Sequence, residues 1–173
     1  MRYTILAVLM ILAAAFSRLL PHPANVAPFA AMALAGGVYL DKRFALLVPL
    51  AAMFVTDLIL GFYTVSFFVY GSFVAIGFLG LWLKSHKKAL PVFGATVTSS
   101  ILFFVVTNFG VWAVGPELYP RSWAGLVECY VAAIPFFRNT VFGDMAYVAV
   151  LFGMFELLSY YARNAAKVQK QSA

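Results

Sequence analysis

The sequence predicts an all-α integral membrane protein with six transmembrane helices and with both termini in the cytoplasm. Of its 173 residues 64% are hydrophobic and only 10% are charged, whereas a soluble domain has about 45–50% apolar and about 25% charged residues. Six apolar runs approach the roughly 20 residues that cross about 30 Å of hydrocarbon. Lysines and arginines gather on one side of these runs, as the positive-inside rule describes. We therefore expect one integral membrane domain over residues 1–173.

The six runs occupy, in chain order, residues 3–19, 26–40, 44–61, 65–83, 90–114 and 139–161. The second run is short and the fifth is long, so we expect tilt or a broken end in each. The first run has a second interpretation as a cleaved signal peptide, because a basic start and an apolar core precede small residues at Ala13, Ala14 and Ala15. Cleavage would leave five spans with the C-terminus still in the cytoplasm, so the distribution of charge does not distinguish a retained span from a cleaved signal peptide. We favour a retained span.

The orientation follows from the 12 basic residues. Nine fall on the side of the N-terminus: Arg2, Lys42, Arg43, Lys84, Lys87, Lys88, Arg163, Lys167 and Lys170. The opposite side holds Arg18, Arg121 and Arg138. This bias is the positive-inside signal, and it accounts for the net charge of +6. We therefore expect the lipid bilayer as a partner and no nucleic acid.

Three polar residues lie inside the predicted spans near their outer ends. Asp57, Asn108 and Asp144 are one or two helical turns from those ends, which places them about 5–10 Å beneath the outer surface. An ionisable group at that depth costs about 2–4 kcal/mol or more against lipid, so these side chains must face the interior. Arg18, at the outer end of the first span, is in reach of Asp57 or Asp144.

The connection after the first span combines polar residues with prolines. His22 and Asn25 lie among Pro21, Pro23 and Pro28, and proline fixes the backbone, so the turn is stiff and holds its donors in place. Two interpretations stand for the outer polar residues. Arg18 with an aspartate is either a structural ion pair or part of a polar cavity that binds a small molecule. We favour one shared cavity, because a single ion pair does not require so many partners.

The last outer loop is long and aromatic. Residues 121–134 predict a short amphipathic helix in the plane of the interface, carrying Trp123, and Pro135 is expected to end it before the final span. This helix is either an interface anchor or a lid over the cavity. Trp112, near the outer end of the fifth span, is expected on the same side of the membrane as this helix.

Small residues mark one face of the second run. Ala27, Ala31 and Ala35 recur every four residues, a pattern typical of close helix packing. The face packs inside the protein or docks a partner subunit, and internal packing is the favoured interpretation. No catalytic motif is present, and Cys129 is the single cysteine. We therefore expect no enzyme activity, no cofactor and no metal site.

Three motifs carry a resemblance to a known family. The stretches "RLLPHPANVAP", "TNFGVW" and "CYVAAIPFFRNT" resemble those of a family of uncharacterised small six-helix bacterial membrane proteins that are described as transport proteins. That family in turn resembles the substrate-binding S-components of energy-coupling factor (ECF) transporters. The resemblance implies an S-component-like bundle in the bacterial inner (cytoplasmic) membrane, with ligand bound at its outer side. The first span departs from the S-component docking pattern, since Ile11 stands between Ala7 and Ala15.

The sequence thus predicts a substrate-binding membrane transport protein that takes up a small vitamin-like metabolite through an outward-facing polar cavity. The candidate ligand-binding residues are Arg18, His22, Asn25, Asp57, Asn108, Trp112, Trp123, Arg138, Asn139 and Asp144. Arginines would neutralise negative groups, amides would donate and accept hydrogen bonds, and tryptophans would stack. The alternative is a non-transporting accessory subunit of a larger membrane complex, whose partner subunits would cover the aromatic and small-residue surfaces.

Overall fold

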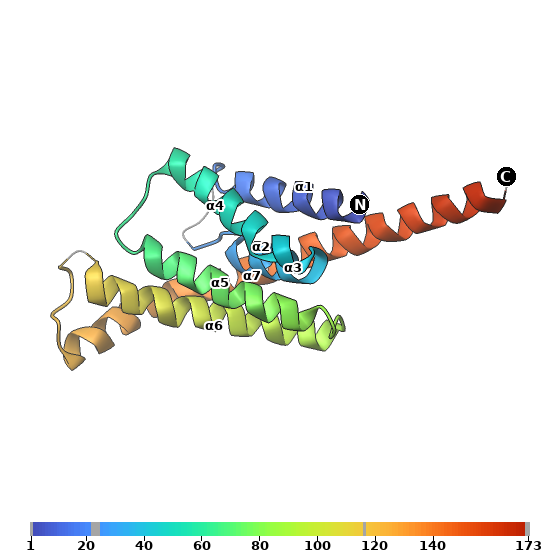
Figure 1. Cartoon of the computed structure of the whole chain (residues 1–173). Coiled ribbons are helices and arrows are strands. Elements are labelled where there is room, and N and C mark those ends of the chain that lie inside the picture. The colour runs from blue at the N-terminus through green and yellow to red at the C-terminus, as the bar shows by residue number, and fades with distance from the viewer. Residues whose placement is uncertain (1, 22–24, 116, 172–173) are drawn as a thin grey trace.

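The computed structural model describes residues 2–21, 25–115 and 117–171, with side chains from residue 4 to residue 164 within those ranges. All regular structure in these ranges is helical (Figure 1), which confirms the predicted all-α class. The helices are, in chain order, α1 (Arg2–Ser17), α2 (Phe29–Tyr39), α3 (Lys42–Ala45), α4 (Leu47–Leu60), α5 (Ser66–Leu83), α6 (Ala89–Val114) and α7 (Trp123–Gln171).

Four helical segments in the described part of the chain are long and apolar enough to cross a membrane. They are Lys42–Leu60, which joins α3 to α4, then α5, α6 and the first 42 residues of α7. The predicted runs 65–83 and 90–114 agree with α5 and α6 to within one residue. The first two predicted spans form shorter apolar helices. With 11 residues, α2 is about 16 Å long and cannot cross a bilayer core by itself.

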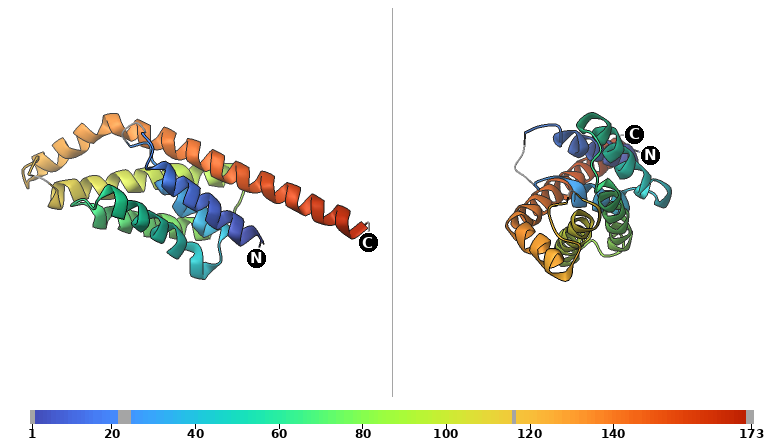
Figure 2. Two further views of the ribbon diagram at one scale, coloured as in Figure 1. Left: turned by 90° about the horizontal axis from the view of Figure 1, so that it is seen from above. Right: turned by 90° about the vertical axis from the view of Figure 1, so that its left-hand side faces the viewer.

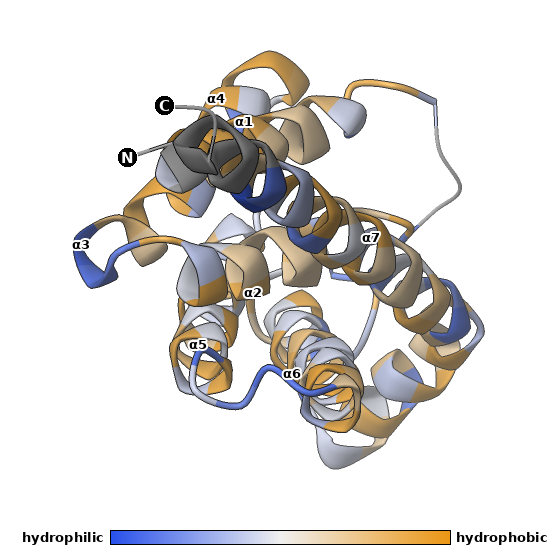
Figure 3. Ribbon diagram, turned by 90° about the vertical axis from the view of Figure 1, so that its right-hand side faces the viewer, coloured by the Kyte–Doolittle hydropathy of each residue, from blue (hydrophilic) through white to orange (hydrophobic). Residues whose placement is uncertain are grey.

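The short helix α2 lies at the centre of the bundle. Every residue from Ala30 to Val38 is buried, and α2 packs against α1, α4, α5, α6 and α7. Figure 3 shows it surrounded by its neighbours when the molecule is viewed along its length. A helix that is apolar on all sides is stable in a protein core or within a membrane, and here the neighbouring helices bury α2. The second apolar run is therefore the core helix of the protein.

Glycines set the contact between α2 and α5. A Cβ atom placed on Gly37 would clash with the backbone carbonyl carbon of Gly80, and one on Gly80 would lie 2.7 Å from the carbonyl oxygen of Leu34. No side chain fits there, so the two backbones touch. Ala31 and Ala35 are buried in the same helix. The small-residue face thus packs internally, as the sequence favoured.

The helix α7 is continuous where the sequence predicts a break. It runs from Trp123 to Gln171 with Pro135 inside it, so the separate helix expected over 121–134 and its end at Pro135 are wrong. The predicted run 139–161 lies within this one helix. A proline removes one N–H donor and crowds the preceding turn, which bends a well-packed helix without ending it. Figure 2 shows this bend in the orange stretch of α7. Val127, Val131 and Ile134 are exposed on its outer surface.

The two ends of the bundle differ in charge. Both chain termini lie at the same end (Figure 1), which we call the cationic end because α3 and the α5–α6 loop bring Lys42, Arg43, Lys84, Lys87 and Lys88 to it. Figure 3 shows the hydrophilic colour of these segments. The opposite end holds the connections that follow α1, α4 and α6. The candidate site residues lie toward this opposite end.

Candidate functional site

A buried ion pair links α1 to α4. Arg18 follows the last turn of α1, and its Nη2 lies 2.8 Å from Oδ1 of Asp57; the two side chains are 7% and 0% exposed. Nη1 donates to the hydroxyl of Thr56, and the hydroxyl of Tyr70 donates to Oδ2 of Asp57 at 2.8 Å. Both carboxylate oxygens are therefore bonded, and each charge is compensated. Of the two partners that the sequence allowed for Arg18, the structure selects Asp57.

Asp144 belongs to a second, separate network. Ser100 on α6 donates its hydroxyl proton to Oδ2 of Asp144 at 2.6 Å. The carboxylate lies beside the first turn of α2, where Ala30 is a neighbour. N–H groups in a first turn have no partner within their helix, and Pro28 gives α2 no side-chain cap. Asp144 on α7 therefore lies where a carboxylate favours the N-terminal end of α2.

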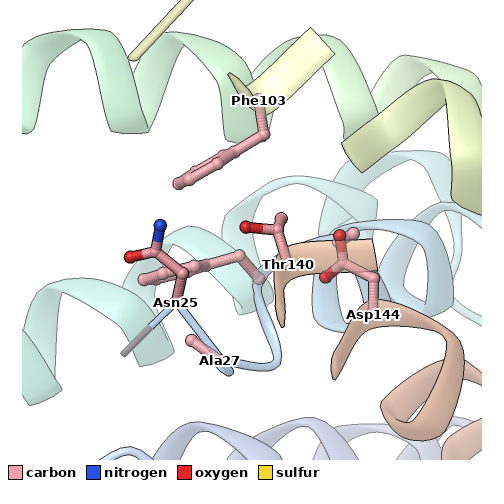
Figure 4. Close-up of a pocket in the computed structure, with 7 residues that line it drawn as sticks. Asn25, Ala27, Phe103, Thr140 and Asp144 are labelled. Atoms are coloured by element: carbon pink, nitrogen blue, oxygen red, sulfur yellow. The ribbon is translucent and has the colours of Figure 1, made fainter. Parts of the chain in front are cut away.

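The Asp144 carboxylate also borders a small cavity of about 50 Å³. Figure 4 shows Asn25, Thr140 and Asp144 around the same space, with Phe103 on its other side. The complete lining is Asn25, Ala27, Phe29, Ala30, Phe103, Thr140 and Asp144. Asn25 has a positive φ of 62°, a conformation that asparagine tolerates better than most residues. The cavity has room for one or two molecules the size of water.

Phe29 lies between the Arg18–Asp57 ion pair and the Asp144 cavity. The guanidinium carbon of Arg18 lies 4.7 Å from the centre of the Phe29 ring, while Phe29 lines the cavity and stacks on Phe103 at 5.3 Å. Arg18 does not line that cavity. The single pocket that the sequence predicted for Arg18, Asp57, Asn108 and Asp144 is therefore divided: the ion pair is one network and Asp144 with its cavity is another.

Asn108 and the two tryptophans lie away from Asp144. The side-chain N–H of Asn108 donates to the backbone carbonyl oxygen of Phe104 in its own helix at 2.8 Å. The backbone carbonyl oxygen of Asn108 accepts from the Cys129 thiol at 3.5 Å. Trp112 and Trp123 line a different and wider hollow of about 380 Å³ near the α6–α7 connection. The indole N–H of Trp112 donates to Pro120 at 3.0 Å. The two tryptophans therefore do not line the Asp144 cavity.

Two further predicted site residues, Arg138 and Asn139, do not line the cavity. Arg138 is exposed and Asn139 is partly buried. Because α7 is helical here, Asn139 points about 100° away from Thr140, which does line the cavity. His22 lies outside the residues that the structure describes.

Sequence reasoning missed several partners of the charged residues. Thr56 and Tyr70 complete the ion-pair network, and Ser100 and Thr140 accompany Asp144. A signal existed for Ser100, because the stretch "TVTSS" puts four hydroxyl groups into an otherwise apolar run. Thr140 closes the quoted motif "CYVAAIPFFRNT". Phe29 had no such signal among 18 phenylalanines.

The cavity offers hydrogen-bond acceptors and one negative charge. The Asp144 carboxylate and the Asn25 amide oxygen accept, and the Thr140 hydroxyl donates weakly to Phe136 of its own helix at 3.4 Å, which leaves its lone pairs available. Within the described ranges, no group of three or more His, Cys, Asp and Glu side chains is placed to hold a metal ion. The arrangement suits a cation or an amine.

In the described part of the chain, four helical segments are long and apolar enough to cross a membrane, and the bundle encloses buried polar side chains. This arrangement fits a helical membrane protein. The chain belongs to the family of unknown function DUF6580, whose sequence profile matches residues 1–168. No curated protein matches the chain, and no solved structure does so. The comparisons therefore support the membership of an uncharacterised family and give no support to the resemblance to ECF S-components.

Proposed function

We propose that this protein is a membrane transport protein that binds a small solute at the Asp144 cavity, on the side facing away from the cytoplasm. The observation that carries the proposal is the position of the carboxylate. Asp144 is 3% exposed, lies in an apolar helix, borders a cavity and has no cationic partner among the described residues. Ionisable groups at such positions typically mark substrate or ion pathways.

The chemistry of the lining favours a positively charged solute. Asp144 supplies a negative charge, and the rings of Phe29 and Phe103 present faces that attract cations. The anionic ligand expected from Arg18 is disfavoured, because Asp57 already balances the charge of this arginine. A pocket for a vitamin-sized ligand measures about 300–1,000 Å³, whereas this cavity measures about 50 Å³. The proposed solute is therefore a small cation or the ammonium head group of a larger molecule.

The motor-docking mode of the S-components is not part of this proposal. In the pattern that the resemblance implies, small residues on the first span form the docking face. Here Ala7, Ile11 and Ala15 are 3%, 1% and 1% exposed, and α1 packs against α2, α4 and α7. That face packs against other helices of the same chain, so a motor subunit would have to dock on another surface.

The test is cation-dependent stabilisation of the purified protein. A ligand that binds only the folded state stabilises it by about 2.7 kcal/mol at 100 times its Kd. The midpoint of thermal unfolding is measured in lipid nanodiscs with the chlorides of sodium, potassium, methylammonium and choline. Wild type is compared with Asp144→Asn and with the control Asp41→Asn, which neutralises an exposed carboxylate that makes no side-chain cap bond.

We expect at least one cation to raise the midpoint of wild type and of Asp41→Asn in a saturable manner, and to leave Asp144→Asn unchanged. The proposal fails if no cation shifts wild type, or if Asp144→Asn responds as wild type does.

An accessory subunit is the second candidate function, and one observation favours it. An apolar groove of about 180 Å³ lies between α1 and α4, lined by Leu12, Ala15, Phe16, Val48, Ala51, Ala52 and Val55. Small residues in such a groove accept a partner helix. Native gel electrophoresis after mild extraction separates the two functions: a stoichiometric larger assembly together with no cation response supports the accessory role.

A further inference from the structure

A third hollow lies at the cationic end, far along the bundle from Asp144. Its volume is about 280 Å³, and it is lined by Val38, Tyr39, Lys84, Lys87, Phe155, Glu156, Ser159 and Arg163. The C-terminal part of α2, the α5–α6 loop and the later part of α7 bring these residues together. The proposed transport function uses none of them.

Positive charge dominates this hollow. Three cations, Lys84, Lys87 and Arg163, face a single carboxylate, that of Glu156. Glu156 accepts a hydrogen bond from the hydroxyl of Tyr39 at 3.3 Å, and the ammonium of Lys87 lies 4.8 Å from the centre of the Tyr39 ring. The cations are thus held around one opening with their charge only partly compensated, which favours an anion.

Each cation keeps donors available. Lys84 gives one proton to the carbonyl oxygen of Leu40 at 2.7 Å, and an ammonium has three. Arg163 donates from Nε to the carbonyl oxygen of Ser159 at 3.2 Å, which leaves the two terminal nitrogens of the guanidinium. These donors suit the several oxygens of a phosphate group.

Ser159 gives an independent sign of a ligand. Its side chain is 5% exposed, and its Oγ is a buried polar atom for which the described structure offers no hydrogen-bond partner. The helical hydroxyls of Ser72, Ser99 and Thr107 each donate to the carbonyl oxygen four residues earlier. Burying a hydroxyl without a hydrogen-bond partner destabilises a protein. A ligand oxygen in the hollow would accept this proton.

We propose that the hollow binds a phosphate group with net negative charge, held by Lys84, Lys87, Arg163 and Ser159. Val38 and Phe155 form an apolar wall beside it. This wall fits the glycerol and upper acyl region of a phospholipid, and basic sites at cytoplasmic helix ends bind anionic head groups. The same chemistry accepts a phosphate compound from solution.

Native mass spectrometry of the detergent-purified chain tests the lipid source. Phosphatidylglycerol, which is anionic, is compared at equal concentration with phosphatidylcholine, which has the same phosphate but no net charge. A second arm measures glycerol 3-phosphate binding by calorimetry. The variants are Lys84→Gln and Ser159→Ala, and the control is Lys88→Gln, which removes one charge from the same loop but does not line the hollow.

We expect wild type and Lys88→Gln to retain phosphatidylglycerol at least tenfold over phosphatidylcholine, and the two test variants to lose most of that preference. If the protein retains phosphatidylglycerol but does not bind glycerol 3-phosphate, the ligand of the hollow is a whole phospholipid. If it binds both, the phosphate head group is sufficient for binding. Ser159→Ala removes an unsatisfied hydroxyl, so its loss of binding cannot be ascribed to unfolding. Equal retention of the two lipids together with no calorimetric signal, or test variants that bind as Lys88→Gln does, would overturn the proposal.

Discussion

Ser100 on α6 donates a hydrogen bond of 2.6 Å to Asp144 on α7, inside the bundle. The carboxylate lies beside the first turn of the core helix α2, where Ala30 lines the same cavity. This one aspartate therefore bonds a neighbouring helix and also borders a cavity. A structural role and a binding role coexist in the same side chain, and the experiments below separate them.

The Ser100–Asp144 bond has a matched control one residue away. Ser100→Ala is expected to lower the free energy of unfolding by about 1.5–3 kcal/mol, since the bond is made to a charged group. Ser99→Ala removes a hydroxyl that bonds only Ala95 of its own helix and should cost less than about 1 kcal/mol. Equilibrium unfolding in mixed detergent micelles measures both. Equal losses would show that the contact with Asp144 does not stabilise the fold.

The Arg18–Asp57 pair predicts a non-additive double-mutant cycle. Asp57→Leu leaves a buried guanidinium without its carboxylate and should destabilise the protein by about 3–5 kcal/mol. Arg18→Met combined with Asp57→Leu removes both charges, so we expect it to regain most of that loss. The same unfolding assay applies. A double variant whose loss equals the sum of the single losses would contradict a direct pair.

The glycine contact between α2 and α5 predicts opposite signs for two substitutions. Gly37→Ala places a Cβ atom against the backbone of Gly80, so it should destabilise the protein by about 1–3 kcal/mol. Gly94→Ala adds a methyl group on α6 with nothing within 4 Å, and should stabilise it by about 0.5–1 kcal/mol. A tolerated Gly37→Ala would show that the two helices are farther apart than described.

The charge difference between the two ends predicts the topology. In a Cys129→Ala background, single cysteines replace Ser85 at the cationic end and Glu117 at the opposite end, both exposed. A membrane-impermeant maleimide added to intact spheroplasts should label the cysteine at 117, and should label the one at 85 only after permeabilisation. The reverse pattern would place the Asp144 cavity on the cytoplasmic side.

Several parts of the fold follow from local rules. The runs that became α5 and α6 are predominantly apolar and contain no charged residue, so their length identifies them. Depth predicted that Arg18 would be in reach of Asp57 or Asp144, because buried opposite charges favour pairing. The choice of Asp57 came from the structure.

Other parts depend on tertiary packing that a sequence pattern does not carry. Residues 26–40 are as apolar as the other runs, and only the assembled bundle shows that α2 is enclosed on all sides. Pro135 satisfies the local rule for ending a helix, yet contacts along α7 outweigh it. The Phe29 ring, which lies against Arg18 and lines the cavity, takes its place through packing alone.

The most direct test of the central claim measures uptake into proteoliposomes. The solute is a cation that has been found to stabilise the protein. Wild type, Asp144→Asn and Asp41→Asn are reconstituted at equal density, and radiolabelled methylammonium is the first probe. The account predicts saturable uptake by wild type and by Asp41→Asn, and at least a tenfold lower rate for Asp144→Asn. Uptake by Asp144→Asn at the wild-type rate would contradict the assignment of the solute site to this cavity.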